Sequence, residues 1–133
     1  MDLISVNAQI KANQYLAETL AQLEKDFLMI GVNFDIEKPI VEYKTLFAFT
    51  NNLVNSLNEQ NPKLILSLLY RIDLSEEMVQ KQMQETSLSF SEMLSELIVK
   101  RELYKVVLRK KISYPFNFLS QWFGSKFFVF WFQ

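Results

Sequence analysis

The sequence contains no cysteine and no histidine, and it has only two glycines and three prolines among 133 residues. Without cysteine the chain has no disulfide, no zinc–thiolate site and no cysteine nucleophile. Without histidine it lacks the usual general base near neutral pH and the commonest ligand of transition metals. The two glycines stand far apart, and no Walker A, GxGxxG or GxSxG motif is present. We therefore expect no enzymatic activity, no catalytic residue, no cofactor and no metal site.

Helix-forming residues make up much of the rest of the chain. Half of the residues are hydrophobic and 22% are charged, and the many Leu, Glu, Lys and Gln favour helices over strands. The length fits one domain with its own core. We predict an all-α protein, in which residues 1–114 form a compact bundle of about five helices and residues 115–133 form an aromatic C-terminal segment.

Net charge and the N-terminal segment bear on location and partners. The net charge is −1 and the pI is about 5.5, which does not indicate a general nucleic-acid binder. The first residues lack the basic segment and apolar core of a signal peptide, so we expect a cytoplasmic location.

Residues 61–73, the most continuously apolar stretch before the C-terminal segment, are predicted to form the central helix. Seven of the nine positions at 64–72 are apolar or aromatic, and a helix that is apolar on nearly every side needs neighbours on every side. Asn61 and Pro62 are a capping residue and a first-turn proline, which together indicate a helix start. Its one narrow polar stripe consists of Lys63, Ser67 and Arg71.

Apolar periodicity and local signals predict the remaining helices. Gly31 is expected to end the first helix, and Ser75 to start the fourth. Ser89 and Glu92 have the spacing of a capping box at the start of the fifth. Phe34, in the connection after the first helix, is expected to tuck under the loop. The four helices are predicted at residues 3–30, 39–58, 76–85 and 90–112.

The predicted helix 90–112 carries a stripe of basic residues in its second half. Such a stripe can bind phosphates or an anionic lipid surface. Alternatively it is a solvated face whose positive charge suits the C-terminal end of a helix. At the other end of this helix Glu92 and Glu96 share a face, and we expect both carboxylates to be solvated rather than to act as an acid–base pair.

The segment after Pro115 is dominated by aromatic residues. Nine of the residues at 116–132 are aromatic, and Lys126 is the only charged side chain. This segment is a poor membrane-spanning helix, because about 20 predominantly apolar residues are needed. Three interpretations remain open: it packs on the bundle, it lies in a membrane interface, or it is extraneous to the natural fold.

The leading functional prediction is a non-enzymatic protein-interaction or structural module that binds an unknown protein or itself. One alternative is a peripheral membrane protein, docked by the end of the fifth helix and the aromatic segment. A second is a nucleic-acid-binding bundle, although nucleic acid and small-molecule substrates are not favoured. The candidate interaction surface consists of Arg101, Lys105, Arg109, Lys110, Lys111, Trp122, Phe123, Phe127, Phe128 and Trp131.

Overall fold

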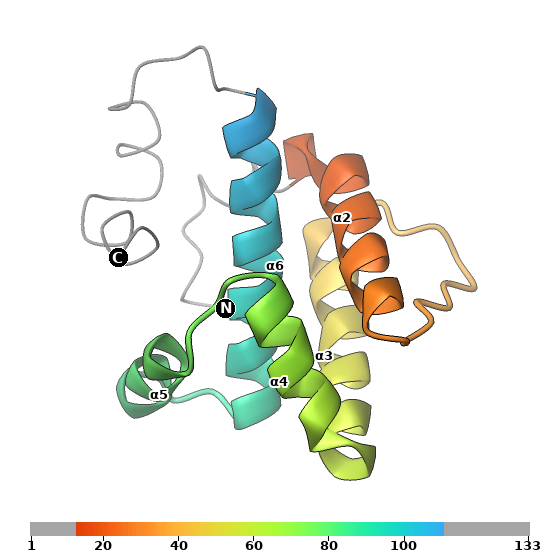
Figure 1. The fold of residues 1–133 in the computed structure, drawn as a ribbon. Helices are drawn as coiled ribbons and strands as arrows, with labels where there is room; N and C mark the ends of the chain where they lie inside the picture. Colours follow the sequence, from red (N-terminus) through yellow and green to blue (C-terminus); the bar gives the residue numbers. More distant parts are fainter. Residues whose placement is uncertain (1–12, 111–133) are drawn as a thin grey trace.

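The computed structural model describes residues 13–110, and this part of the chain contains five α-helices and no strand. The helices pack into a compact bundle, as Figure 1 shows, which confirms the predicted fold class. Three predictions lie outside the described residues: the extension of the first helix over residues 3–12, the end of the fifth helix at residues 111–112 and the aromatic segment 115–133. The helices are α2 (Leu16–Met29), α3 (Tyr43–Gln60), α4 (Pro62–Arg71), α5 (Glu76–Glu85) and α6 (Phe90–Lys110). Within the described residues the first helix is not continuous as predicted, because Tyr15 lies in a turn just before α2.

The long helix α6 is the centre of the bundle. It packs against α3, α2 and α5, and Figure 1 shows it between α5 on one side and α2 and α3 on the other. Its 21 residues span about 30 Å at 1.5 Å per residue, which is enough to line the whole bundle. Most of it is buried, at Met93, Leu94, Ser95, Glu96, Leu97, Ile98, Val99, Arg101, Glu102, Leu103, Tyr104, Val106 and Val107.

The prediction that α4 is the central helix is wrong. Leu66 is 51% exposed and Tyr70 is 91% exposed, so α4 shows an apolar side to solvent. With only ten residues, α4 spans about 15 Å. A helix this short packs by one face against α3 and α2 and cannot be lined on every side. Its buried residues are Ile65, Leu68 and Leu69.

Helix α2 and the loop that follows it agree with the sequence pattern. Leu23 and Phe27 are fully buried, and Gly31 has a φ of +84°, a left-handed conformation that ends the helix as predicted. In the loop, Phe34 stacks on Phe27 with ring centroids 5.3 Å apart and meets Phe49 of α3 edge-on at 4.7 Å. Phe34 therefore belongs to the core between α2 and α3, as the sequence indicated.

The predicted start signals differ in outcome. The Ser75 hydroxyl accepts a hydrogen bond from the backbone N–H of Met78 at 3.1 Å, and the Ser89 hydroxyl accepts one from Glu92 at 3.3 Å. These two serine caps are confirmed, as is Pro62 in the first turn of α4. The other half of the predicted capping box differs, because Glu92 Oε1 accepts from the Ser89 hydroxyl at 2.8 Å rather than from the Ser89 backbone N–H. Asn61, however, makes no side-chain capping bond, so that part of the prediction is wrong.

Helix α3 begins four residues later than predicted. Glu42 is extended, with φ −145° and ψ 154°, and the helix starts at Tyr43. The backbone N–H of Tyr43 donates to the side-chain oxygen of Asn13 at 2.8 Å, so a residue distant in sequence satisfies the first turn. No helix in residues 13–110 is long and apolar enough to cross a membrane.

Candidate functional site

Four ionisable side chains meet where α2, α4 and α6 come together. Arg71, the last residue of α4, donates through Nε to Asp26 Oδ1 at 2.8 Å. Lys105 of α6 places its Nζ 3.4 Å from Asp26 Oδ2 and 3.1 Å from Glu102 Oε1. We call Asp26, Arg71, Glu102 and Lys105 the ionic cluster. It joins residues that are up to 79 positions apart in the sequence.

Asp26 is the acceptor at the middle of the ionic cluster. Its side chain is only 3% exposed, because it lies in the last turn of α2 beside the fully buried Phe27. Gln22, one turn earlier, donates to Asp26 Oδ2 at 3.0 Å. A buried carboxylate is tolerated only with such partners. Asp26 therefore receives hydrogen bonds or ion pairs from all three helices of the junction.

The two acids of the ionic cluster have opposite pKa shifts. Burial, with a hydrogen bond to Asp26, raises the pKa of Glu102 to about 8. Burial also acts to raise the pKa of Asp26. Hydrogen bonds from Glu102 and Gln22, with the positive charge of Lys105, outweigh it, so the pKa of Asp26 falls below its ordinary value. When the pKa values of two neighbouring carboxyl groups shift in opposite directions, the group with the raised pKa can donate a proton and the group with the lowered pKa can accept one.

Arg101 of α6 fixes the turn between α4 and α5. It is 9% exposed, and its Nε donates to the backbone oxygen of Ile72 at 2.9 Å. Its guanidinium also lies 3.7 Å from the Asp73 carboxylate and over the ring of Tyr104. Asp73 has a φ of +63°, a left-handed conformation that Asp tolerates better than most residues. Arg101 therefore stabilises the turn between α4 and α5.

The predicted basic stripe does not form one exposed face. Arg101 is buried and Lys105 is engaged in the ionic cluster, whereas Arg109 and Lys110 are exposed. Lys110 pairs with Glu18 of α2 at 2.8 Å. A row of every fourth residue rotates by about 40° per step around an α-helix, so it passes from the interior to the surface. Lys111, Trp122, Phe123, Phe127, Phe128 and Trp131 lie outside the described residues.

The expectation that Glu96 is solvated is wrong. Glu96 is fully buried. Burial raises the pKa of Tyr43 on α3, and the negative charge of Glu96 raises it further. Burial lowers the pKa of Lys100, and the same carboxylate opposes that shift. The neighbouring Glu92 is half-buried at the helix start. The apolar Met93, Leu94, Leu97, Ile98 and Val99 around position 96 were the available sequence signal, since they put much of this part of the helix in the core.

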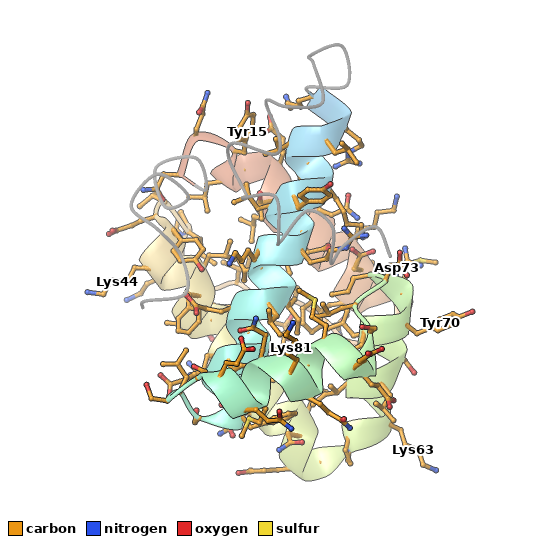
Figure 2. All side chains as sticks on the ribbon, turned by 90° about the vertical axis from the view of Figure 1, so that its left-hand side faces the viewer. Tyr15, Lys44, Lys63, Tyr70, Asp73 and Lys81 are labelled. Atoms are coloured by element: carbon orange, nitrogen blue, oxygen red, sulfur yellow. The ribbon has the colours of Figure 1, made fainter. Side chains whose placement is uncertain are left out.

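The outer surface of α4 forms a second candidate site. Figure 2 shows Lys63 and Tyr70 extending outward along the same edge of the molecule, with Asp73 close to that edge. Beside Tyr70 lies an open hollow of about 460 Å³. We call Lys63, Leu66, Ser67 and Tyr70 the α4 outer face; all four are exposed. The hollow is lined by Leu69, Tyr70, Arg71, Asp73, Leu74 and Ser75.

No protein-family model, curated protein or solved structure matches this chain. Function is therefore inferred from the geometry of this chain alone. In residues 13–110 no three His, Cys, Asp or Glu side chains gather in a way that could hold a metal ion. The described residues thus offer two features to explain: the ionic cluster inside and the α4 outer face outside.

Proposed function

We propose that this chain is a non-enzymatic protein-interaction module that docks through the α4 outer face. The observation that supports this proposal is the 91% exposure of Tyr70 beside an open hollow, with Leu66 exposed one turn earlier. A tyrosine gives a large, rigid apolar contact with one polar end, and tyrosines are enriched among the residues that dominate binding energy at interfaces.

A second copy of the same chain is the partner that this face fits. The face has Lys63 at one end and Tyr70 at the other, with Asp73 beyond it, 87% exposed at its side chain. A two-fold axis near Leu66 sets two α4 helices antiparallel and brings Lys63 of each copy to Tyr70 and Asp73 of the other. A lysine over a tyrosine ring and a lysine near a carboxylate are both attractive.

The same geometry predicts a weak dimer. Helix α4 is about 15 Å long, so the paired face falls below the roughly 1,200 Å² of a standard interface. Ser67 sits in the middle of the face and already donates to the backbone oxygen of Lys63 at 3.2 Å, which limits the cost of burying its hydroxyl. We expect a dissociation constant on the order of 100 μM.

Sedimentation equilibrium of the full chain tests this proposal. Tyr70→Ser and Lys63→Glu are each expected to weaken self-association by about tenfold, the effect of a well-packed interface residue. Lys44→Glu is the matched control, because Lys44 is an exposed lysine of α3 on the opposite side of the molecule in Figure 2. A chain that stays monomeric at millimolar concentration, or equal dimerisation of all three variants, contradicts the proposed face.

The membrane alternative remains a second proposal with narrower support. Arg109 and Lys110 are exposed at the end of α6, but the aromatic residues on which it depends lie outside the described residues. Binding to anionic vesicles that is lost when residues 116–133 are removed would favour it. The nucleic-acid alternative has less support, because Arg101 and Lys105 are engaged within the bundle.

A further inference from the structure

We propose that Asp26 and Glu102 form a proton-binding pair: at neutral pH Glu102 holds a proton and donates it to the Asp26 carboxylate. Loss of that proton at mildly alkaline pH weakens the junction of α2, α4 and α6. This pair is independent of the proposed docking face, since it lies inside the bundle.

The arrangement of hydrogen-bond donors supports the bound proton. Among residues 13–110, Lys105 is the ammonium group that contacts both acids, at 3.4 Å from Asp26 and 3.1 Å from Glu102. Arg71 contacts Asp26 at 2.8 Å. Glu102 is fully buried, and its Oε2 accepts no hydrogen bond within the part of the chain that the structure describes. An ionised carboxylate with an unsatisfied buried oxygen is costly, whereas a protonated one becomes a donor.

Charges on the other packed elements do not replace this proton. On α6, Arg101 also acts on Glu102, but its Nε is bound to the backbone oxygen of Ile72. On α3, the titratable group is Tyr43, and the carboxylate that interacts with it electrostatically is Glu96, six residues before Glu102. On α5, the buried side chains are Met78 and Val79, which carry no charge.

The direction of the pH effect follows from the two pKa shifts. Glu102 has a pKa of about 8 in the folded chain against an ordinary value of 4.5, so between these values the folded chain holds one proton more than the unfolded chain. The unfolding constant then rises by up to tenfold per pH unit between about 5 and 8. Asp26 acts in the opposite sense: its lowered pKa stabilises the fold above its ordinary value of 3.8, and this is lost in acid.

Carbon-13 NMR of the full chain with labelled glutamate carboxyl groups tests the proton directly. One glutamate carboxyl group is expected to titrate near pH 8, and its resonance should be missing from Glu102→Gln. Asp26→Asn, which removes the carboxylate acceptor, should move that midpoint to lower pH. If the Glu102 carboxyl group titrates below pH 6 in the folded chain, the proposal is overturned.

Urea unfolding at pH 5 and pH 8 tests the consequence for the junction. Glu102→Gln keeps a neutral hydrogen-bond donor that does not titrate. The fold increase of its unfolding constant from pH 5 to pH 8 should therefore be at least tenfold smaller than the fold increase for the unsubstituted chain. Glu24→Gln, an exposed acid of α2, is the matched control and should follow the unsubstituted chain. An unchanged pH dependence in Glu102→Gln contradicts the coupling. If Glu102→Gln does not fold, the Asp26→Asn titration still decides the question.

Discussion

Helices α4 and α6 differ in a way that composition alone does not suggest. Helix α4 is apolar at most positions, yet Leu66 and Tyr70 are exposed. Helix α6 carries many charges, yet it is the central helix, and Glu96 and Glu102 on it are fully buried. The comparison teaches that the place of a helix in this bundle follows from its length and its partners. A 21-residue helix can contact several neighbours along its length, whereas a ten-residue helix cannot.

Buried charge in α6 is tolerated because other helices supply its partners. Asp26 of α2 meets Lys105, and the carbonyl oxygen of Ile72, after α4, meets Arg101. Removing one partner from such a buried group is costly, since the other is left without its hydrogen bond. The buried charged side chains of α6 therefore connect neighbouring helices, whereas the exposed side chains of α4 need no partner from another helix.

The largest expected difference is between a core leucine of α6 and the exposed leucine of α4. Leu103 is 1% exposed, and Leu103→Ala should lower the free energy of unfolding by about 3 kcal/mol, through lost burial and the cavity left behind. Leu66→Ala should change it by no more than about 0.5 kcal/mol. Urea unfolding at a concentration where the chain is monomeric measures both. Equal losses would mean that α4 is as deeply packed as α6.

A smaller effect is expected from the ionic cluster. Asp26→Ala leaves Arg71 and Lys105 without their shared acceptor. We expect a loss of about 2 kcal/mol, below the usual cost of breaking a buried pair, because both cations are roughly a third exposed and can be hydrated. Thermal or urea unfolding measures it. Glu24→Ala, on the solvent side of α2, is the control and should be close to neutral.

The smallest expected difference concerns the helix starts. Ser89 caps α6, so Ser89→Ala should cost about 1 kcal/mol. Asn61 makes no capping bond at the start of α4, so Asn61→Ala should cost only a few tenths. Paired urea unfolding curves measure the difference. A larger loss from Asn61→Ala would show that its side chain bonds to the helix in solution.

The sequence predicted those features of the fold that depend on neighbouring residues. The bounds of α5, the caps at Ser75 and Ser89 and the helix end at Gly31 each depend on contacts or conformations within a few positions. It did not predict the ionic cluster, because the partners of Asp26 lie 45 and 79 positions away. No local pattern distinguishes an arginine that will find a buried carboxylate from one that will stay in water.

The order of the helices and the chemistry of the helix ends at Gly31, Ser75 and Ser89 were therefore determined by the sequence itself, since hydrogen bonds and backbone conformations within one turn decide them. The start of α3 was not, because its first turn binds the distant Asn13. Tertiary structure decided which helix is central, which acid holds a proton and which apolar side chains are exposed. Those outcomes depend on how far each helix extends and on which charges distant segments bring to it. Burial and electrostatic pairing act between segments far apart in the chain.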